Sequence, residues 1–149
     1  MPAGRLTYIA NIRLPTEKAH GYQIIKMCEA WARQGLETRL LYPSRRQSDQ
    51  ALQQADIFRY YGVPPVFQLE KLPNWDVVAA DPYLPGWLGT PLFRIHAFLW
   101  SSYATGQAAK RGADLYFTRD SESAFWLSRQ GRPVLYEEHA LPHGFQRWW

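Results

Sequence analysis

Three residues near the N-terminus have types and spacing suited to binding a phosphate. Lys18, His20 and Gly21 lie in a short polar segment between the apolar residues 6–12 and an amphipathic run. The first N–H groups of a helix lack partners within it and carry a partial positive charge, and glycine lets an anion approach the backbone. We therefore predict that these residues bind a phosphate. Gly21 also suits tight packing at a helix start, and Lys18 and His20 also suit a solvated loop.

Three arginines are candidates for binding an anionic acceptor or a lipid phosphate. Arg13, Arg45 and Arg119 each come one to three residues after a predicted strand. The carboxyl ends of parallel strands meet at one edge of a sheet, where the ligands of such sheets bind. We predict that the arginines face this edge. For Arg119 the alternative is a local ion pair with Asp120 at the start of a helix.

Two adjacent carboxylates and a histidine follow the last apolar segment. Glu137 and Glu138 have the residue type of a general acid and base, but adjacent residues on a strand point to opposite faces. We therefore expect one of them to face the ligand edge and expect no acid–base pair. His139 comes next and is a candidate site residue; the alternative is a histidine that is hydrogen-bonded within a loop.

Other site chemistries find little support in the sequence. We predict no metal site, because zinc-ligand spacing is missing among the four histidines, His20, His96, His139 and His143. The single cysteine, Cys28, lies on an apolar stripe and is expected to be a buried small hydrophobe. The N-terminal segment lacks the Gly-x-Gly-x-x-Gly spacing, which argues against dinucleotide binding.

The composition is that of an ordinary globular protein with one domain. The chain has 149 residues, of which 46% are hydrophobic and 20% charged, and its net charge is +4. This mild positive charge suits nucleotide phosphates or an anionic membrane surface, and its even spread predicts no nucleic-acid partner. The lone cysteine, the missing leader pattern and the missing long apolar run predict a cytoplasmic protein.

Hydrophobic periodicity and turn residues predict alternating strands and helices. Ile24, Met27, Cys28 and Trp31 recur at helical spacing and are expected to form one buried face. Prolines and glycines over residues 72–91 predict an irregular segment. Strands are predicted over 6–12, 37–42, 66–70, 114–118 and 133–137, and helices over 20–34, 55–62, 93–110 and 121–130, the last with Ser121 as N-cap.

This alternation predicts an α/β fold. Strand, helix and strand follow one another with tight connections at both ends of the chain, which favours right-handed crossovers in a parallel sheet. We therefore expect a doubly wound, mostly parallel, Rossmann-like sheet with helices on both faces. The ligand edge of such a sheet would hold the loops that follow the strands.

Three segments resemble the N-terminal domain of family 4 glycosyltransferases, which have the two-domain GT-B fold. The first is residues 9–35, with LPTEKAHG in its loop. The second is DIFRYYG over residues 56–62, followed by FQL. The third is ADLYFTRD over residues 113–120, leading to PVLYEEH over residues 133–139. Together they cover nearly the whole chain in the family's order, which implies that residues 1–149 form the N-terminal, acceptor-side domain.

The resemblance implies a reaction and roles for particular residues. Enzymes of this family move a sugar from a nucleotide diphosphate sugar to an acceptor in the cleft between two domains, with retention at the anomeric carbon and without a bound metal or other cofactor. The loop at Lys18, His20 and Gly21 would approach the donor diphosphate. His139 would face the donor sugar as the catalytic residue. The second domain, which carries a pair of glutamates in this family, is absent from this sequence.

We therefore expect the N-terminal half of a retaining glycosyltransferase, inactive alone, with the donor half supplied in cis or by a partner chain. The acceptor would be a glycan, a lipid or a small molecule. The helix predicted over residues 93–110 could lie on the inner face of the membrane, although core packing suits it better. The rival interpretation is a non-catalytic α/β module that binds a nucleotide or a glycan, or one subunit of a split enzyme.

Overall fold

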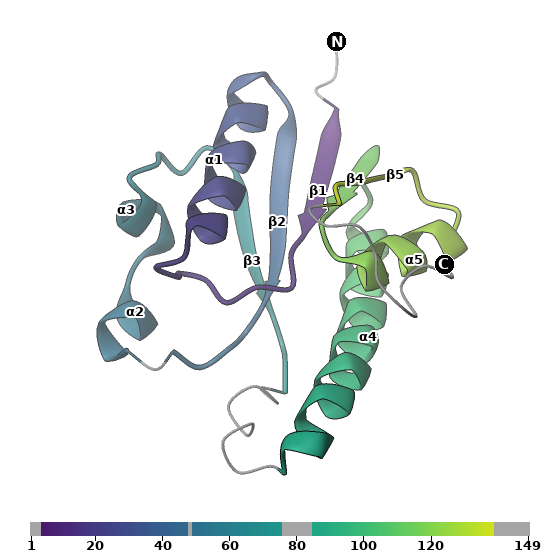
Figure 1. Ribbon diagram of the computed structural model, residues 1–149. Helices are drawn as coiled ribbons and strands as arrows, with labels where there is room; N and C mark the ends of the chain where they lie inside the picture. Colours follow the sequence, from purple (N-terminus) through teal and green to yellow (C-terminus); the bar gives the residue numbers. More distant parts are fainter. Residues whose placement is uncertain (1–3, 48, 76–84, 139–149) are drawn as a thin grey trace.

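A computed structural model describes residues 4–47, 49–75 and 85–138 of the protein. Its centre is a five-stranded sheet in the order β3-β2-β1-β4-β5, in which each strand pair is parallel (Figure 1). The strands are β1 Arg5–Ile9, β2 Glu37–Pro43, β3 Gln68–Leu72, β4 Leu115–Thr118 and β5 Val134–Tyr136. The helices are α1 Ala19–Arg33, α2 Gln50–Gln54, α3 Ile57–Tyr61, α4 Gly86–Arg111 and α5 Ser121–Arg129. The predicted doubly wound α/β fold is confirmed.

Alternate residues along the central strand contribute to two separate parts of the core. Tyr8 and Ala10 belong to an apolar cluster with Ile24 of α1, whereas Ile9 belongs to a second cluster with Trp100 of α4. Side chains alternate between the two faces of a strand, so both faces of this sheet are apolar and need cover. Figure 1 shows α1 and α3 over one face and α4 and α5 over the other.

The helix predicted over residues 20–34 is α1, and the predicted buried face is confirmed. Ile24 and Cys28 are buried, and Met27 and Trp31 pack against the same cluster. The helix ends just before Gly35, whose φ of 88° lies in the left-handed region that favours glycine. The periodicity of the sequence was sufficient here because one face of α1 covers the sheet and the other faces solvent.

The structure differs most from the predicted elements in three places. β1 ends at Ile9 rather than at residue 12, because the backbone turns there toward α1. α2 forms where no element was predicted, with the Asp49 carboxylate accepting the Ala51 N–H at its start. α4 begins at Gly86 rather than at residue 93 and contains Pro91. A proline near a helix start removes only one hydrogen bond, and apolar residues continue the helix on both sides.

Candidate functional site

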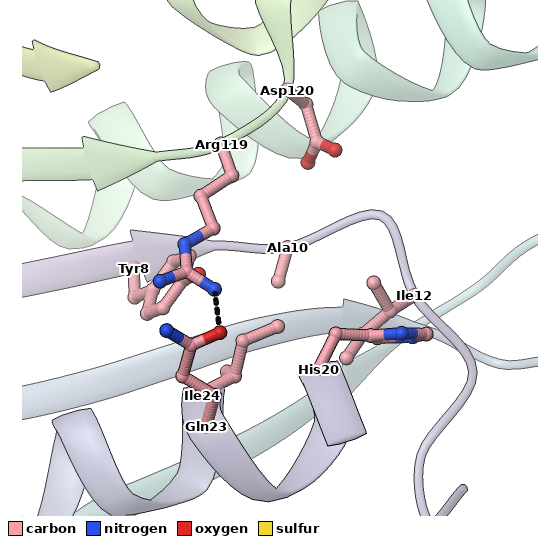
Figure 2. Close-up of a pocket in the computed structure, with 8 residues that line it drawn as sticks. All are labelled: Tyr8, Ala10, Ile12, His20, Gln23, Ile24, Arg119 and Asp120. Atoms are coloured by element: carbon pink, nitrogen blue, oxygen red, sulfur yellow. Dashed lines mark hydrogen bonds between the residues drawn. The ribbon is translucent and has the colours of Figure 1, made fainter. Parts of the chain in front are cut away.

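A pocket opens at the carboxyl edge of the sheet, between β1 and β4. The chain runs from β1 to β2 on one side, whereas β4 and β5 lie on the other, so the strand order reverses at this point. Ligands of open α/β sheets bind at such a reversal. The pocket has a volume of about 390 Å³. It is lined by residues from three segments of the chain (Figure 2): Tyr8, Ala10, Ile12, His20, Gln23, Ile24, Arg119 and Asp120.

The hydroxyl of Tyr8 is a buried polar group in this pocket without a hydrogen-bond partner among the described residues. The Tyr8 side chain is fully buried, and its ring packs edge-on against Phe117 and Trp31. Burial raises the pKa of the phenol, so the hydroxyl keeps its proton at neutral pH. A buried polar group without a partner costs about 1–3 kcal/mol, so this hydroxyl lowers the stability of the protein.

Arg119 forms a wall of the pocket and is held by neighbouring side chains. Its Nε and Nη2 atoms donate to the Glu137 carboxylate at 2.9 and 3.2 Å, and its Nη1 donates to Gln23 Oε1 at 3.0 Å (Figure 2). Only 11% of the Arg119 side chain is exposed. The carboxylate that pairs with Arg119 is therefore Glu137 and not Asp120, the partner considered from the sequence. Arg119 lines the pocket, and its charge is already paired.

Asp120 follows Arg119 in the lining of the pocket and has an unusual environment. Its carboxylate accepts the backbone N–H of Asn11 at 2.7 Å, which ties the segment after β4 to the segment after β1. Burial raises the pKa of Asp120 to about 6, against the opposing effect of that hydrogen bond. Asp120 is also the N-cap residue of α5, but its side chain makes no capping hydrogen bond. The prediction of Ser121 as N-cap is therefore wrong.

The three residues at the start of α1 separate into different environments. His20 lines the pocket, whereas Lys18 is the exposed N-cap residue of the helix. Partial burial, Lys18 and Arg119 lower the pKa of His20, so its imidazole is neutral at neutral pH. Gly21 is buried, and its N–H donates to the Lys18 carbonyl at 3.0 Å. A Cβ at Gly21 would lie 2.5 Å from the Tyr61 hydroxyl, so this glycine permits a close packing contact.

The remaining predicted site residues lie away from the pocket lining or outside the described residues. Arg45 donates to the Asn11 side chain and so joins the segment after β2 to the segment after β1. Arg13 lies in that second segment and does not line the pocket. His139 lies outside the described residues.

The adjacent carboxylates take separate partners, as expected from their places next to a strand. Glu137 accepts hydrogen bonds from Arg119 at the ligand edge. Glu138 accepts one from the hydroxyl of Tyr136. The two carboxylates therefore do not act as one acid–base pair, which agrees with the alternation of side chains along an extended chain.

Sequence reasoning missed two polar residues of the pocket, Tyr8 and Gln23. The sequence pattern places Tyr8 in a strand and Gln23 in a helix and predicts no site role for either. Each carried a signal that could have been used. Gln23 lies three residues after His20 and so shares its face of α1. Tyr8 is a polar-tipped side chain near the end of an apolar strand, just before the ligand edge.

Within residues 4–47, 49–75 and 85–138, no group of three or more His, Cys, Asp or Glu side chains is arranged to hold a metal ion. The buried position predicted for Cys28 is confirmed, and burial raises the pKa of its thiol. Such a thiol is a poor nucleophile, because the thiolate is the reactive form. The polar side chains that line the pocket, by contrast, can form hydrogen bonds with a ligand.

Neither the known family models nor the curated proteins give a match to this chain. Among solved structures it is similar to apo UGT2 of Phytolacca americana, a UDP-glycosyltransferase, with a TM-score of 0.58 and 14% sequence identity. The match covers 93% of this chain but only 30% of UGT2, so the chain spans less than a third of that protein. At this sequence identity the similarity shows the fold alone: the chain forms an α/β domain similar to part of a GT-B glycosyltransferase. The similarity does not favour family 4 over other glycosyltransferase families.

Proposed function

We propose that this chain is the acceptor-side half of a glycosyltransferase that uses a nucleotide diphosphate sugar and retains the anomeric configuration. The observation that carries the proposal is the pocket at the reversal of strand order, which contains the buried, unpartnered hydroxyl of Tyr8. The likeness to a GT-B glycosyltransferase supports the class of reaction. We further propose that the protein acts in the cytoplasm and that the donor half is supplied in cis or by a partner chain.

In this proposal the pocket binds the sugar acceptor through its hydroxyl groups. The Tyr8 hydroxyl gains the partner that it lacks, and the Asp120 carboxylate accepts from an acceptor hydroxyl. The hydrogen bonds to Glu137 hold the Arg119 side chain in place in the lining of the pocket. Tyr8 and Asp120 form hydrogen bonds with hydroxyl groups, and the positive charge of Arg119 is already paired with Glu137. A neutral polyol such as a sugar therefore fits the pocket better than a phosphate does.

The start of α1 favours the departing diphosphate in the same proposal. As the bond between the anomeric carbon and the phosphate oxygen breaks, negative charge develops on the diphosphate, and a helix N-terminus with Lys18 and His20 stabilises it. The acceptor oxygen forms the new bond on the same face, and its proton passes to the diphosphate. His139 stays a predicted contact of the donor sugar, and Arg13 and Arg45 stay predicted contacts of the acceptor outside the pocket lining.

The decisive experiment asks whether a donor half exists and restores activity. The coding sequence beyond Trp149 is read, and if it ends there a tagged chain is used to recover a partner. Transfer of a labelled sugar from UDP-sugars and GDP-sugars is then measured for the chain alone and for the two halves together. We expect transfer only with both halves. Turnover by this chain alone, or two halves that bind nucleotide without transferring sugar, would contradict the proposal and favour a binding module.

A further inference from the structure

Helix α4 is much longer than the strands that it covers. Its 26 residues span about 39 Å, whereas the five residues of β1 span about 17 Å. The C-terminal half of α4 packs on the sheet through Trp100, Ala104 and Ala108. The N-terminal half continues past the carboxyl ends of the strands, at the lower end of the molecule in Figure 1. We call residues 87–95 the α4 overhang.

The α4 overhang exposes large apolar side chains that a helix usually buries. Trp87 is 77% exposed and Ile95 58% exposed, and Leu99 extends the same stripe at 62%. Phe93 is exposed as well, although it lies at helical spacing from Ala97 and Trp100, which are buried. The overhang is thus apolar on both sides of the helix, and such a helix is stable only when an apolar environment covers it.

The charge of α4 indicates what that environment is. The overhang contains Arg94 and no Asp or Glu, whereas Lys110 and Arg111 lie at the other end of α4, where Arg111 pairs with Glu70. Arg94 is exposed within the overhang itself, among tryptophan, phenylalanine and isoleucine. An arginine among exposed apolar and aromatic side chains, without acidic ones, suits a helix end that lies in the interface of a membrane containing anionic lipids.

We propose that the α4 overhang inserts into the surface of a bilayer that contains anionic phospholipids. The apolar side chains enter the boundary between headgroups and acyl chains, and Arg94 contacts lipid phosphates. The contact is peripheral: no helix of the described ranges is both long and apolar enough to cross a membrane. A second copy of the chain is a poorer occupant, because its overhang would add another Arg94 and no carboxylate to pair with it. The inference stands apart from the proposed sugar transfer.

The test measures binding of the 149-residue chain to lipid vesicles by co-sedimentation. Vesicles of phosphatidylcholine alone are compared with vesicles of phosphatidylcholine and phosphatidylglycerol. We expect binding to the mixed vesicles and much weaker binding to the neutral ones. The double variant Ile95→Glu/Leu99→Glu should lower binding to mixed vesicles by about tenfold or more, because carboxylates oppose both the apolar and the anionic part of the interface. Both side chains are exposed, so the fold tolerates the change.

A matched control carries the same kind of substitution at the opposite edge of the sheet. Val66 is 48% exposed and precedes β3, so Val66→Glu should leave vesicle binding unchanged. The proposal would be overturned if Val66→Glu lost as much vesicle binding as Ile95→Glu/Leu99→Glu does. It would also be overturned if the unaltered chain did not bind the mixed vesicles. Dimers in light scattering that disappear in Ile95→Glu/Leu99→Glu, without vesicle binding, would overturn it in favour of a second copy. Unfolding midpoints confirm that the variants fold.

Discussion

At the scale of single residues, the two parts of the Tyr8 side chain have opposite effects on stability. The ring of Tyr8 supports the core through its contacts with Phe117 and Trp31. The hydroxyl adds a polar atom that the described residues leave without a partner. A group that lowers stability and faces a pocket is the pattern expected of a binding residue, because function and stability make opposite demands on it.

Replacing Tyr8 with phenylalanine should therefore stabilise the protein. We expect Tyr8→Phe to raise the free energy of unfolding by about 1 kcal/mol, because it removes a desolvated hydroxyl and keeps the ring. In the two-half transfer assay the same variant should raise the KM for the acceptor by about tenfold. Urea unfolding and acceptor titrations check the two results. Tyr22→Phe is the control, because Tyr22 is exposed on α1 and should change neither quantity. Lower stability in Tyr8→Phe would show that the hydroxyl has a partner.

Asp120 should make stability depend on pH in a definite direction. Its pKa is raised from 3.8 to about 6, so the folded protein binds a proton more tightly than the unfolded chain does between these values. The resulting stability is fully present below about pH 4 and is lost as the pH rises through about 6, an effect of about 2–3 kcal/mol. Asp120→Asn keeps an oxygen acceptor for the Asn11 N–H and cannot titrate.

The measurement is the difference in unfolding free energy between the original protein and Asp120→Asn from pH 4 to pH 7. This difference isolates Asp120 from Glu17, Glu29 and Asp114, whose lowered pKa values give stability that is lost as the pH falls. We expect the variant to become relatively more stable as the pH rises to 7. A difference that stays constant over this range would mean that Asp120 titrates normally.

At the scale of elements, the close approach of α1 to the loop before it depends on Gly21. The Tyr61 hydroxyl donates to the carbonyl of Thr16 at 3.0 Å and accepts the Thr16 N–H at 2.8 Å. This pair of hydrogen bonds holds the loop against α3, and Gly21 lies directly beside it. The loop that leads into α1 is therefore fixed from the side away from the pocket.

Substituting Gly21 with alanine should loosen this arrangement. We expect Gly21→Ala to lower the free energy of unfolding by about 1–3 kcal/mol, because the added methyl group overlaps the Tyr61 hydroxyl and the Thr16 side chain. Gly106→Ala is the matched control: it lies within α4, and its Cβ would meet nothing within 4 Å. That control should raise stability by about 0.5–1 kcal/mol, as alanine does within a helix. Similar effects at both sites in thermal unfolding would contradict the packing role of Gly21.

Elements with strong local patterns were predictable, and those set by distant contacts were not. The face of α1 follows from its own periodicity, and the short strands follow from β-branched and aromatic runs. The start of α4 was missed because prolines and glycines were treated as helix breakers, although the helix tolerates Pro91 in its second turn. The ligand edge was predictable from the alternation of strands and helices, which implies a parallel sheet. The place of Tyr8 in the pocket was not, because it depends on β4, which lies far along the chain.

At the scale of the whole molecule, one edge of the sheet gathers the functional features. The pocket between β1 and β4 lies at the carboxyl ends of the strands. Figure 1 shows that the start of α1 and the N-terminal half of α4 lie at the same edge. The chain also corresponds to only 30% of the length of UGT2. A second half of a GT-B enzyme would close over this same edge, so sugar transfer and membrane contact would have to share it.

The central position of β1 has a consequence for how the chain is made. One edge of β1 pairs with β2, which follows closely, but its other edge pairs Ile9 with Thr118. A ribosome that adds about 5–20 residues per second needs on the order of 10 s to produce the residues between them. During that interval the nascent chain carries an apolar strand with an open edge, which is prone to pair with other strands. Chaperone demand during translation should therefore be greatest before residue 118 emerges.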